Sequence, residues 1–102
     1  TTTIKAAPMM HSPPHPGTIL RELYLTPMRV TVIEAANALG VTSKHVSGIV
    51  NGRARITADM AIRLAAALGT DAQTWVNLQA QHDLWVASRK KPARVKSLRR
   101  AA

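Results

Sequence analysis

Across the central part of the chain the apolar positions recur every three or four residues, which is the spacing of one face of an α-helix. Thr31, Thr42 and Thr57 stand directly before three of these apolar stretches, where a threonine side chain can cap a helix. Gly40 and Gly69 follow two of the stretches, and a glycine there can take the left-handed conformation that stops a helix. The pattern predicts five helices joined by short turns, and therefore an all-α domain.

Prolines and a loss of periodicity delimit the folded part. Pro16 suits a first helical turn because its missing N–H would be unpaired there, and Pro27 is expected to break the first helix. Residues 1–14 show no periodicity and are expected to form a flexible arm. The apolar pattern ends before residues 89–102, which are expected to form a tail, so the helical domain spans residues 15–88.

The second and third helices are joined only by Gly40-Val41. Two helices packed at a steep angle through such a turn form a helix-turn-helix, whose second helix lies in the DNA major groove. Ala36 supplies the small residue needed where the helices cross, and Gly40 supplies the left-handed turn. The apolar residues expected to fasten the two helices are Ala35, Leu39, Val41, Val46 and Ile49. Residues 43–50 are the expected recognition helix, and Asn51-Gly52 directly follow its last residue.

Charge supports a nucleic-acid partner. The chain has 14 Lys and Arg against 5 Asp and Glu, a net charge of +9. Seven of the basic residues and no acidic residue lie in the tail, residues 89–102, so a polyanion is the natural partner. The tail is expected to contact phosphates without reading bases. A solvated tail that only keeps the protein soluble would have the same composition.

The expected recognition helix carries no acidic side chain. Ser43, Lys44 and Ser47 occupy its groove side and are expected to contact base edges, with Lys44 a candidate for guanine. Its N-terminus attracts phosphate through free N–H groups and the helix dipole. The expected DNA-binding residues are Thr42, Ser43, Lys44, His45, Ser47, Asn51, Arg53 and Arg55.

Composition argues against several other classes of protein. The absence of cysteine excludes disulfides and thiolate zinc sites, and no metal or cofactor is expected. His11 and His15 are separated by two prolines, so they cannot share a helical face as a zinc pair would. No Ser-His-Asp or paired-carboxylate arrangement is present, so the chain is not expected to be an enzyme. With two Trp, one Tyr and no Phe, base-stacking RNA modules are disfavoured.

No membrane or secretory segment is expected. The longest unbroken apolar run is Leu64-Ala-Ala-Ala-Leu68, far short of the roughly 20 residues of a membrane span. Residues 1–10 contain one Lys and no apolar block, unlike a secretory signal. The expected location is therefore the cytoplasm, with association with the nucleoid through DNA.

The fifth helix is expected to begin after a cap at Thr70 or Asp71. Trp75, early in this helix, is expected to pack on the fourth helix. Trp85, near its end, has fewer partners within one chain and is expected at a dimer interface. The residues expected at that interface are Leu78, Leu84 and Trp85. A two-fold dimer would place two recognition helices about 34 Å apart.

Six stretches of residues 15–87 carry a family resemblance. They are His15-Pro-Gly-Thr-Ile-Leu-Arg-Glu22, Leu39-Gly-Val-Thr42, Ile49-Val-Asn-Gly-Arg53, Ile56-Thr-Ala-Asp-Met-Ala-Ile-Arg-Leu-Ala65, Trp75-Val-Asn-Leu-Gln79 and Asp83-Leu-Trp85. In this order and spacing they resemble the HigA-type antitoxins, also described as plasmid-maintenance antidote or VapI-like proteins. These belong to the Cro/CI-type helix-turn-helix superfamily. The last two stretches are the distinctive ones, because general Cro/CI-type repressors lack them.

The resemblance implies a five-helix Cro/CI-type (lambda-repressor-like) fold and a symmetric dimer that binds double-stranded operator DNA at its own promoter. It also implies neutralisation of a co-encoded toxin, usually a small ribosome-dependent mRNA endonuclease. A stand-alone Cro/CI-type transcriptional regulator without a toxin would use residues 31–55 in the same way, so both functions stay open at this point. The residues that would bind a toxin are not identified.

The chain departs from the family pattern in three places. Thr31-Val32 opens the second helix where the family usually has Ser or Thr followed by Gln, so an amide that commonly touches the DNA backbone is lacking. Ala72-Gln73-Thr74 replaces the Pro-Glu-Phe that usually precedes the tryptophan, which removes one aromatic core contact. The tail from Arg89 has no counterpart in the family.

Overall fold

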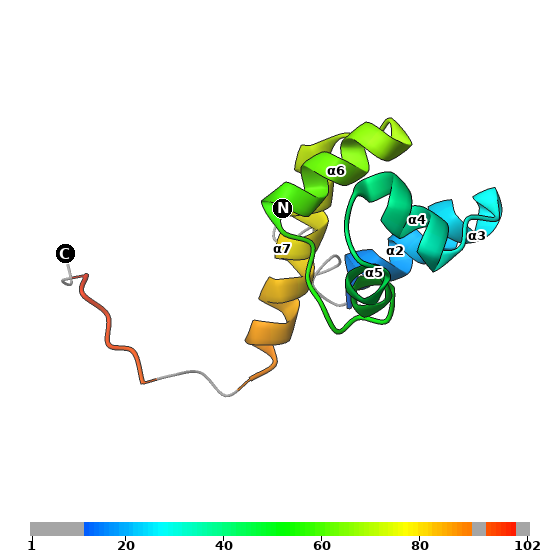
Figure 1. Ribbon diagram of the computed structural model, residues 1–102. Helices are drawn as coiled ribbons and strands as arrows, with labels where there is room; N and C mark the ends of the chain where they lie inside the picture. The colour runs from blue at the N-terminus through cyan, green and yellow to red at the C-terminus, as the bar shows by residue number, and fades with distance from the viewer. Residues whose placement is uncertain (1–11, 91–93, 100–102) are drawn as a thin grey trace.

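The computed structural model describes residues 12–90 and 94–99, and within these ranges it contains helices and no strands. In chain order the elements are α2 (Pro16–Ile19), η1 (Leu20–Leu25), α3 (Thr26–Met28), α4 (Val32–Leu39), α5 (Ser43–Val50), α6 (Ala58–Leu68) and α7 (Ala72–Ser88). The first three follow one another without a break and form one helix (Figure 1). The described residues therefore form five helices, as the apolar periodicity predicts.

The prediction that Pro27 breaks the first helix is wrong, because the helix continues to Met28. Its middle part, η1, is a π-helix, and the Thr26 N–H donates to the carbonyl of Arg21, five residues earlier. The hydrogen-bond register has thus already widened when the chain reaches the proline, which eases the clash of its ring with the preceding turn. The helix ends instead at Arg29, which takes the left-handed conformation at φ 58°.

Threonine caps begin α4, α5 and α6 as predicted. Thr31 Oγ1 accepts from the Glu34 N–H at 3.1 Å, and Glu34 Oε1 accepts from the Thr31 N–H at 2.8 Å, a complete capping box. Hydrogen bonds from the Thr31 backbone and side chain hold the pKa of the Glu34 carboxyl below its usual range. Thr42 and Thr57 each accept from the N–H three residues further on, at 3.1 and 3.2 Å.

The other predicted ends agree in part. Gly40 ends α4 in the left-handed conformation at φ 72°. At the end of α5, Gly52 takes the left-handed conformation at φ 75°, whereas Asn51 lies at φ −97°. Asp71 is the N-cap of α7, but its carboxylate accepts from the Thr74 hydroxyl at 3.2 Å and caps no backbone N–H.

One apolar core joins the five helices. Trp75, on α7, is buried in it with its ring 5.7 Å from that of Tyr24, and its Nε1–H donates to Thr70 Oγ1 at 2.8 Å. Each large side chain buried here stabilises the fold by about 1.5–3 kcal/mol relative to exposure. The buried core residues are Leu20, Leu25, Ala35, Ala36, Leu39, Val46, Ile49, Val50, Ile56, Met60, Ala61, Leu64 and Trp75.

The recognition helix is held between its neighbours. α5 packs against α4 and α2, while α6 packs against α4 and α7 (Figure 1). The contact of α2 with α5 is very close, because a β-carbon on Gly17 would overlap the carbonyl of Ile49. The first helix therefore fixes the C-terminal end of α5.

The ends of the described chain are only partly covered by helix. The carbonyl of Pro13 accepts a hydrogen bond from His82 Nδ1 at 3.1 Å, which attaches the residues before α2 to α7. Residues 94–99 carry no helix and are exposed. Residues 1–11 of the expected arm, and residues 91–93 and 100–102 of the expected tail, lie outside the described residues.

Candidate nucleic-acid interface

The structure places α4 and α5 as the two helices of a helix-turn-helix. The turn runs from Gly40 to Thr42, and the Val41 N–H donates to the carbonyl of Ala36 at 3.1 Å. The residues predicted to fasten the two helices lie at their contact, fully buried except for the half-buried Val41: Ala35, Leu39, Val41, Val46 and Ile49.

The N-terminal turn of α5 is open to an approaching ligand. Thr42, Ser43 and Lys44 are exposed there. Thr42 Oγ1 accepts from the N–H of His45, which is half-buried. The turn carries no acidic side chain, and the partial positive charge of a helix N-terminus favours anions such as phosphate.

Ser47 and Asn51 lie one turn apart and contact each other. The Asn51 amide Nδ2 donates to the Ser47 carbonyl at 2.9 Å and to its Oγ at 3.2 Å. The Asn51 side chain thus caps the C-terminal end of α5, and half-buried Ser47 is held by it. The structure brings two predicted residues together, Ser47 in the middle of α5 and Asn51 at its C-terminal end.

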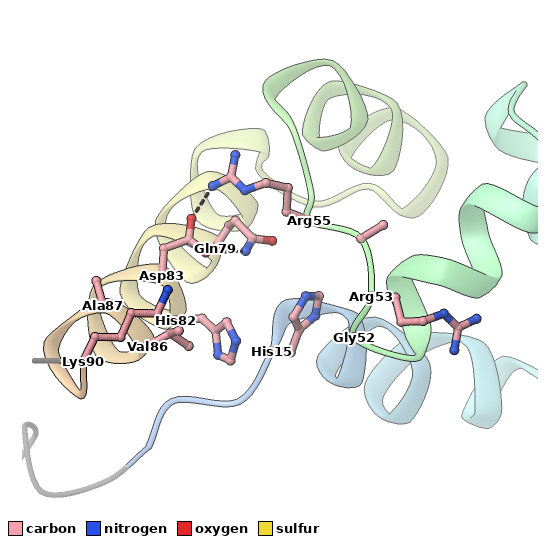
Figure 2. Close-up of a pocket in the computed structure, with 11 residues that line it drawn as sticks. His15, Gly52, Arg53, Arg55, Gln79, His82, Asp83, Val86, Ala87 and Lys90 are labelled. Atoms are coloured by element: carbon pink, nitrogen blue, oxygen red, sulfur yellow. Dashed lines mark hydrogen bonds and ion pairs between the residues drawn. The ribbon is translucent and has the colours of Figure 1, made fainter.

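Arg53 and Arg55 follow α5 on an exposed loop, but their side chains point in opposite directions (Figure 2). Arg55 points towards α7 and forms an ion pair with Asp83. Arg53 points away from α7 and is exposed. Arg53 and Arg55, which the sequence analysis predicts to bind DNA in the same way, therefore have different surroundings in the structure.

A buried glutamine fixes this loop. Gln79 is the only buried polar residue among the described residues, at 3% exposed. Its Oε1 accepts from the Ile56 N–H at 2.7 Å, and its Nε2 donates to Asp83 Oδ1 at 2.9 Å. Burial raises the pKa of the Asp83 carboxyl. Hydrogen bonds from Gln79 and Arg55, together with the charge of Arg55, lower it by more, so the pKa lies below the usual 3.8.

Sequence reasoning missed the roles of Gln79 and Asp83. Gln79 ends one of the two distinctive stretches that carry the family resemblance, and Asp83 begins the other. Their place in these stretches is the only feature of the sequence that points to a role for them. Together they attach the chain that leaves the recognition helix to α7.

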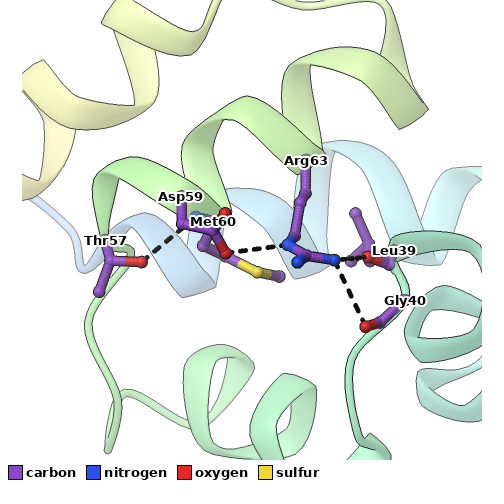
Figure 3. Close-up of polar contacts among 6 residues, drawn as sticks. All are labelled: Leu39, Gly40, Thr57, Asp59, Met60 and Arg63. Atoms are coloured by element: carbon purple, nitrogen blue, oxygen red, sulfur yellow. Dashed lines mark hydrogen bonds and ion pairs between the residues drawn. The ribbon is translucent and has the colours of Figure 1, made fainter.

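Arg63 is a third residue that sequence reasoning missed. It lies on α6 and its Nη1 donates to the carbonyls of Leu39 at 2.8 Å and Gly40 at 3.4 Å (Figure 3). Asp59 holds the guanidinium by accepting from its Nε at 2.9 Å. Because the last carbonyls of a helix carry partial negative charge, this cation stabilises the end of α4 where the turn to α5 begins.

The residues predicted for a dimer interface differ in their surroundings. Leu84 is 72% exposed. Trp85 is half-buried, and the Arg89 guanidinium lies 4.8 Å over its ring. Leu78 is half-buried and packs against the core of its own chain. Of the three predicted residues, Leu84 is therefore the most exposed.

Residues 12–90 and 94–99 contain neither a metal site nor a membrane span. No group of three or more His, Asp or Glu side chains in these ranges is arranged to hold a metal ion. Likewise, none of the helices in these ranges combines the length and apolar character needed to cross a bilayer.

Comparison with known proteins identifies the family. The sequence model of the helix-turn-helix family HTH_3 matches residues 20–75, more than half of the chain and the whole of the motif described above. The chain belongs to this helix-turn-helix family. Virulence-associated protein I of Dichelobacter nodosus is 46% identical over 77 residues, which are 76% of this chain and 71% of that protein.

Relatives with solved structures have the same fold. Pseudomonas aeruginosa antitoxin HigA, solved with the higBA promoter, has a TM-score of 0.72 and 43% identity, over 74% of this chain and 82% of that one. Antitoxin GraA has a TM-score of 0.76 and 40% identity, over 78% and 85% of the two chains. The Cro/CI-type fold and the resemblance to HigA-type antitoxins are thus confirmed. The chain is a DNA-binding protein of a family of antitoxins and transcription regulators, and it is not an enzyme.

Proposed function

We propose that this chain is the antitoxin of a type II toxin–antitoxin module. It binds operator DNA as a dimer, represses its own operon and neutralises a cognate mRNA-endonuclease toxin. One observation carries the proposal: α5 has an exposed, acid-free N-terminal turn in a chain 43% identical to an antitoxin HigA solved with its promoter.

The DNA contacts divide by position. Ser43 and Lys44, at the open end of α5, contact base edges together with Ser47. Arg53 contacts phosphate, since its side chain is exposed and points away from α7. Arg55 contacts phosphate after its ion pair with Asp83 has opened. The remaining residues of the proposed interface are Thr42, His45 and Asn51. They position the DNA backbone or contact the DNA at the edge of the interface.

The proposed dimer forms along α7. Leu84 and Trp85 supply its apolar surface, and Leu78 lies at its border. A two-fold axis through this surface would place the two copies of α5 about one DNA turn, roughly 34 Å, apart, so that they enter successive major grooves.

A second function is favoured by particular relatives. An uncharacterized HTH-type transcriptional regulator of Haemophilus influenzae is 39% identical over 77 residues, which are 76% of this chain and 72% of that protein. A protein of this kind would bind DNA through the same residues without any toxin.

Co-expression with the product of the neighbouring open reading frame separates the two functions. We expect a small basic protein that stops growth alone, is neutralised by this chain and co-purifies with it. A Lys44→Ala variant should keep neutralisation and bind the promoter more weakly, because α5 contacts DNA. Promoter binding without any co-purifying or toxic neighbour would make the chain a stand-alone regulator. Loss of neutralisation in Lys44→Ala would place toxin contacts on α5 and contradict the proposed division.

A further inference from the structure

A pocket of about 530 Å³ lies between the loop that follows α5 and the C-terminal half of α7 (Figure 2). Three segments line it: His15 at the start of α2, residues 52–55 and one face of residues 79–90. Its volume falls within the range of about 300–1,000 Å³ that is usual for small-molecule sites. The exposed N-terminal turn of α5 contributes nothing to its lining.

The charged side chains of the lining favour an anion. Lys90 and Arg55 are cationic and Asp83 is the one acidic residue of the lining, whereas the side chain of Arg53 points away from α7 (Figure 2). Asp83 is engaged by Arg55 and by Gln79, so its carboxylate is already neutralised. The excess positive charge therefore lies with Lys90, while Arg55 keeps guanidinium N–H groups that can still donate hydrogen bonds.

Two imidazoles lie in the lining, and one of them offers an N–H donor. The rings of His15 and His82 lie edge to face with centroids 5.0 Å apart. His15 Nδ1 accepts from the Gly17 N–H at 2.9 Å, so in the neutral ring the proton is on Nε2. Burial, and then the charge of His82, lower the pKa of His15, with Asp83 opposing, which keeps this neutral tautomer at pH 7. His15 thus offers an N–H donor.

The rest of the lining is apolar. Val86 and Ala87 of α7 form an apolar wall beside the cationic and imidazole groups. An inorganic ion would leave this wall in contact with water, whereas an apolar body would cover it. We propose that the pocket binds a small organic anion, a carboxylate or phosphate ester that carries a compact apolar group.

Such a ligand would oppose DNA binding. Arg55 belongs both to the pocket and to the proposed phosphate contacts, so an anion bound to Arg55 competes with a DNA phosphate for the same guanidinium. This coupling rests on the proposed function, whereas binding of the anion itself does not.

Phenyl phosphate is the probe, titrated into the full chain while the imidazole signals of His15 and His82 are followed by NMR. Inorganic phosphate is titrated in parallel at matched ionic strength. We expect saturable binding of phenyl phosphate about tenfold tighter than that of inorganic phosphate, because its ring covers the apolar wall. Equal affinities, or shifts that do not saturate, would overturn the assignment.

Ala87→Glu tests the location, and Ala80→Glu is the matched control. Both alanines are exposed on α7, but only Ala87 lines the pocket, and the two variants have the same net charge. Ala87→Glu should weaken phenyl phosphate binding about tenfold or more through charge repulsion, and Ala80→Glu should change it less than about twofold. Equal effects of the two variants would show general charge attraction and overturn the site.

A third titration addresses the coupling. Phenyl phosphate should release promoter DNA from the wild-type chain at concentrations that leave Ala87→Glu bound to it. Release from both at the same concentration would overturn the coupling. If promoter DNA binds neither protein, the proposed function fails, while the NMR titration still decides on the pocket.

Discussion

At the scale of single residues, Gly17 shows how closely the first helix approaches the recognition helix. A β-carbon at this position would overlap the backbone carbonyl of Ile49, which cannot move aside as a flexible side chain can. The close approach therefore requires glycine, and any side chain must push α2 away from α5.

Gly17→Ala should lower the free energy of unfolding by about 1–3 kcal/mol, the usual effect of overpacking. Gly48→Ala is the matched control, because it is also helical and its β-carbon would meet only the Ala54 side chain at 3.3 Å. There a gain in helix propensity offsets the tight contact, and a change within about 0.5 kcal/mol is expected. Urea unfolding followed by tryptophan fluorescence measures both. Equal losses in the two variants would mean that the close approach to Ile49 is not the cause.

How far residues could be predicted from sequence depended on how far apart their partners lie. The caps at Thr31, Thr42 and Thr57 could be predicted because each bonds within three residues. The bond from Ile56 to Gln79 joins residues 23 positions apart, and no periodicity reports such a pairing. The Arg55–Asp83 pair, 28 positions apart, escaped prediction for the same reason.

At the scale of elements, the orientation of α5 depends on contacts made at both of its ends by other helices. Arg63 of α6 donates to the carbonyl of Leu39, where α4 ends and the turn to α5 begins. Gln79 of α7 accepts from the N–H of Ile56, in the loop that follows α5. The helix-turn-helix pattern itself could be predicted, because its turn and crossing residues are local. The helices that hold it in place could not, because their contacts are made by side chains that look solvent-facing in the pattern.

The first helix shows a different limit. Pro27 was expected to break it because proline removes a donor and clashes in a regular α-helix. The π-helical register of η1 removes that conflict, and neither composition nor apolar spacing indicates such a register.

Arg63→Met should loosen the turn between α4 and α5 while keeping the side-chain stem. We expect a loss of about 1 kcal/mol in the free energy of unfolding, because the side chain is 40% exposed and solvent weakens its hydrogen bonds. Promoter affinity should fall more than affinity for random DNA, since base contacts need a fixed recognition helix. Asp59→Asn, which keeps the bonds to Leu39 and Gly40, is the control and should change neither affinity by more than about twofold. Equal losses on the two DNAs in Arg63→Met would contradict a positioning role.

The start of α2 should make stability depend on pH. His15 caps this helix through its unprotonated Nδ1, and its pKa lies below the ordinary 6.5, first because of burial and then because of His82, with Asp83 opposing. The unfolded chain therefore takes up this proton more readily than the folded chain. The free energy of unfolding should fall as the pH drops below about 7.

His15→Asn removes the titrating group and keeps a side-chain oxygen that can cap the helix. Urea unfolding between pH 5 and 8 should give a flatter profile for this variant than for the wild type. Parallel profiles would exclude His15 as the source of the pH dependence.

At the scale of the whole molecule, the fold class, the helix count and the DNA-binding motif could all be predicted, because each depends on periodicity, caps and turns. Charge is distributed unevenly along the chain. Seven of the fourteen basic residues lie in residues 89–102, and the stretch 94–99 is exposed and without helix.

Removing residues 89–102 should weaken promoter and random DNA binding by similar factors, because residues 94–99 of this segment carry no helix that could serve as a rigid frame for reading bases. The slope of log affinity against log salt should flatten by about 0.9 for each phosphate that the tail neutralises in the full chain. Titrations of the truncated and full chains at several salt concentrations measure this. An unchanged slope would show that the tail does not contact DNA phosphates.

The central claim is that the open end of α5 reads DNA sequence. The measurement that tests it most directly is a fluorescence-anisotropy titration of wild-type and Lys44→Ala chains with promoter DNA and with a scrambled duplex of the same length. We predict that the wild type binds the promoter about a thousandfold or more tightly than the scrambled duplex. Lys44→Ala should lose about 1–3 kcal/mol on the promoter and less on the scrambled duplex. Equal wild-type affinity for the two duplexes would contradict sequence reading by α5, and equal losses in Lys44→Ala would show that Lys44 contacts only phosphate.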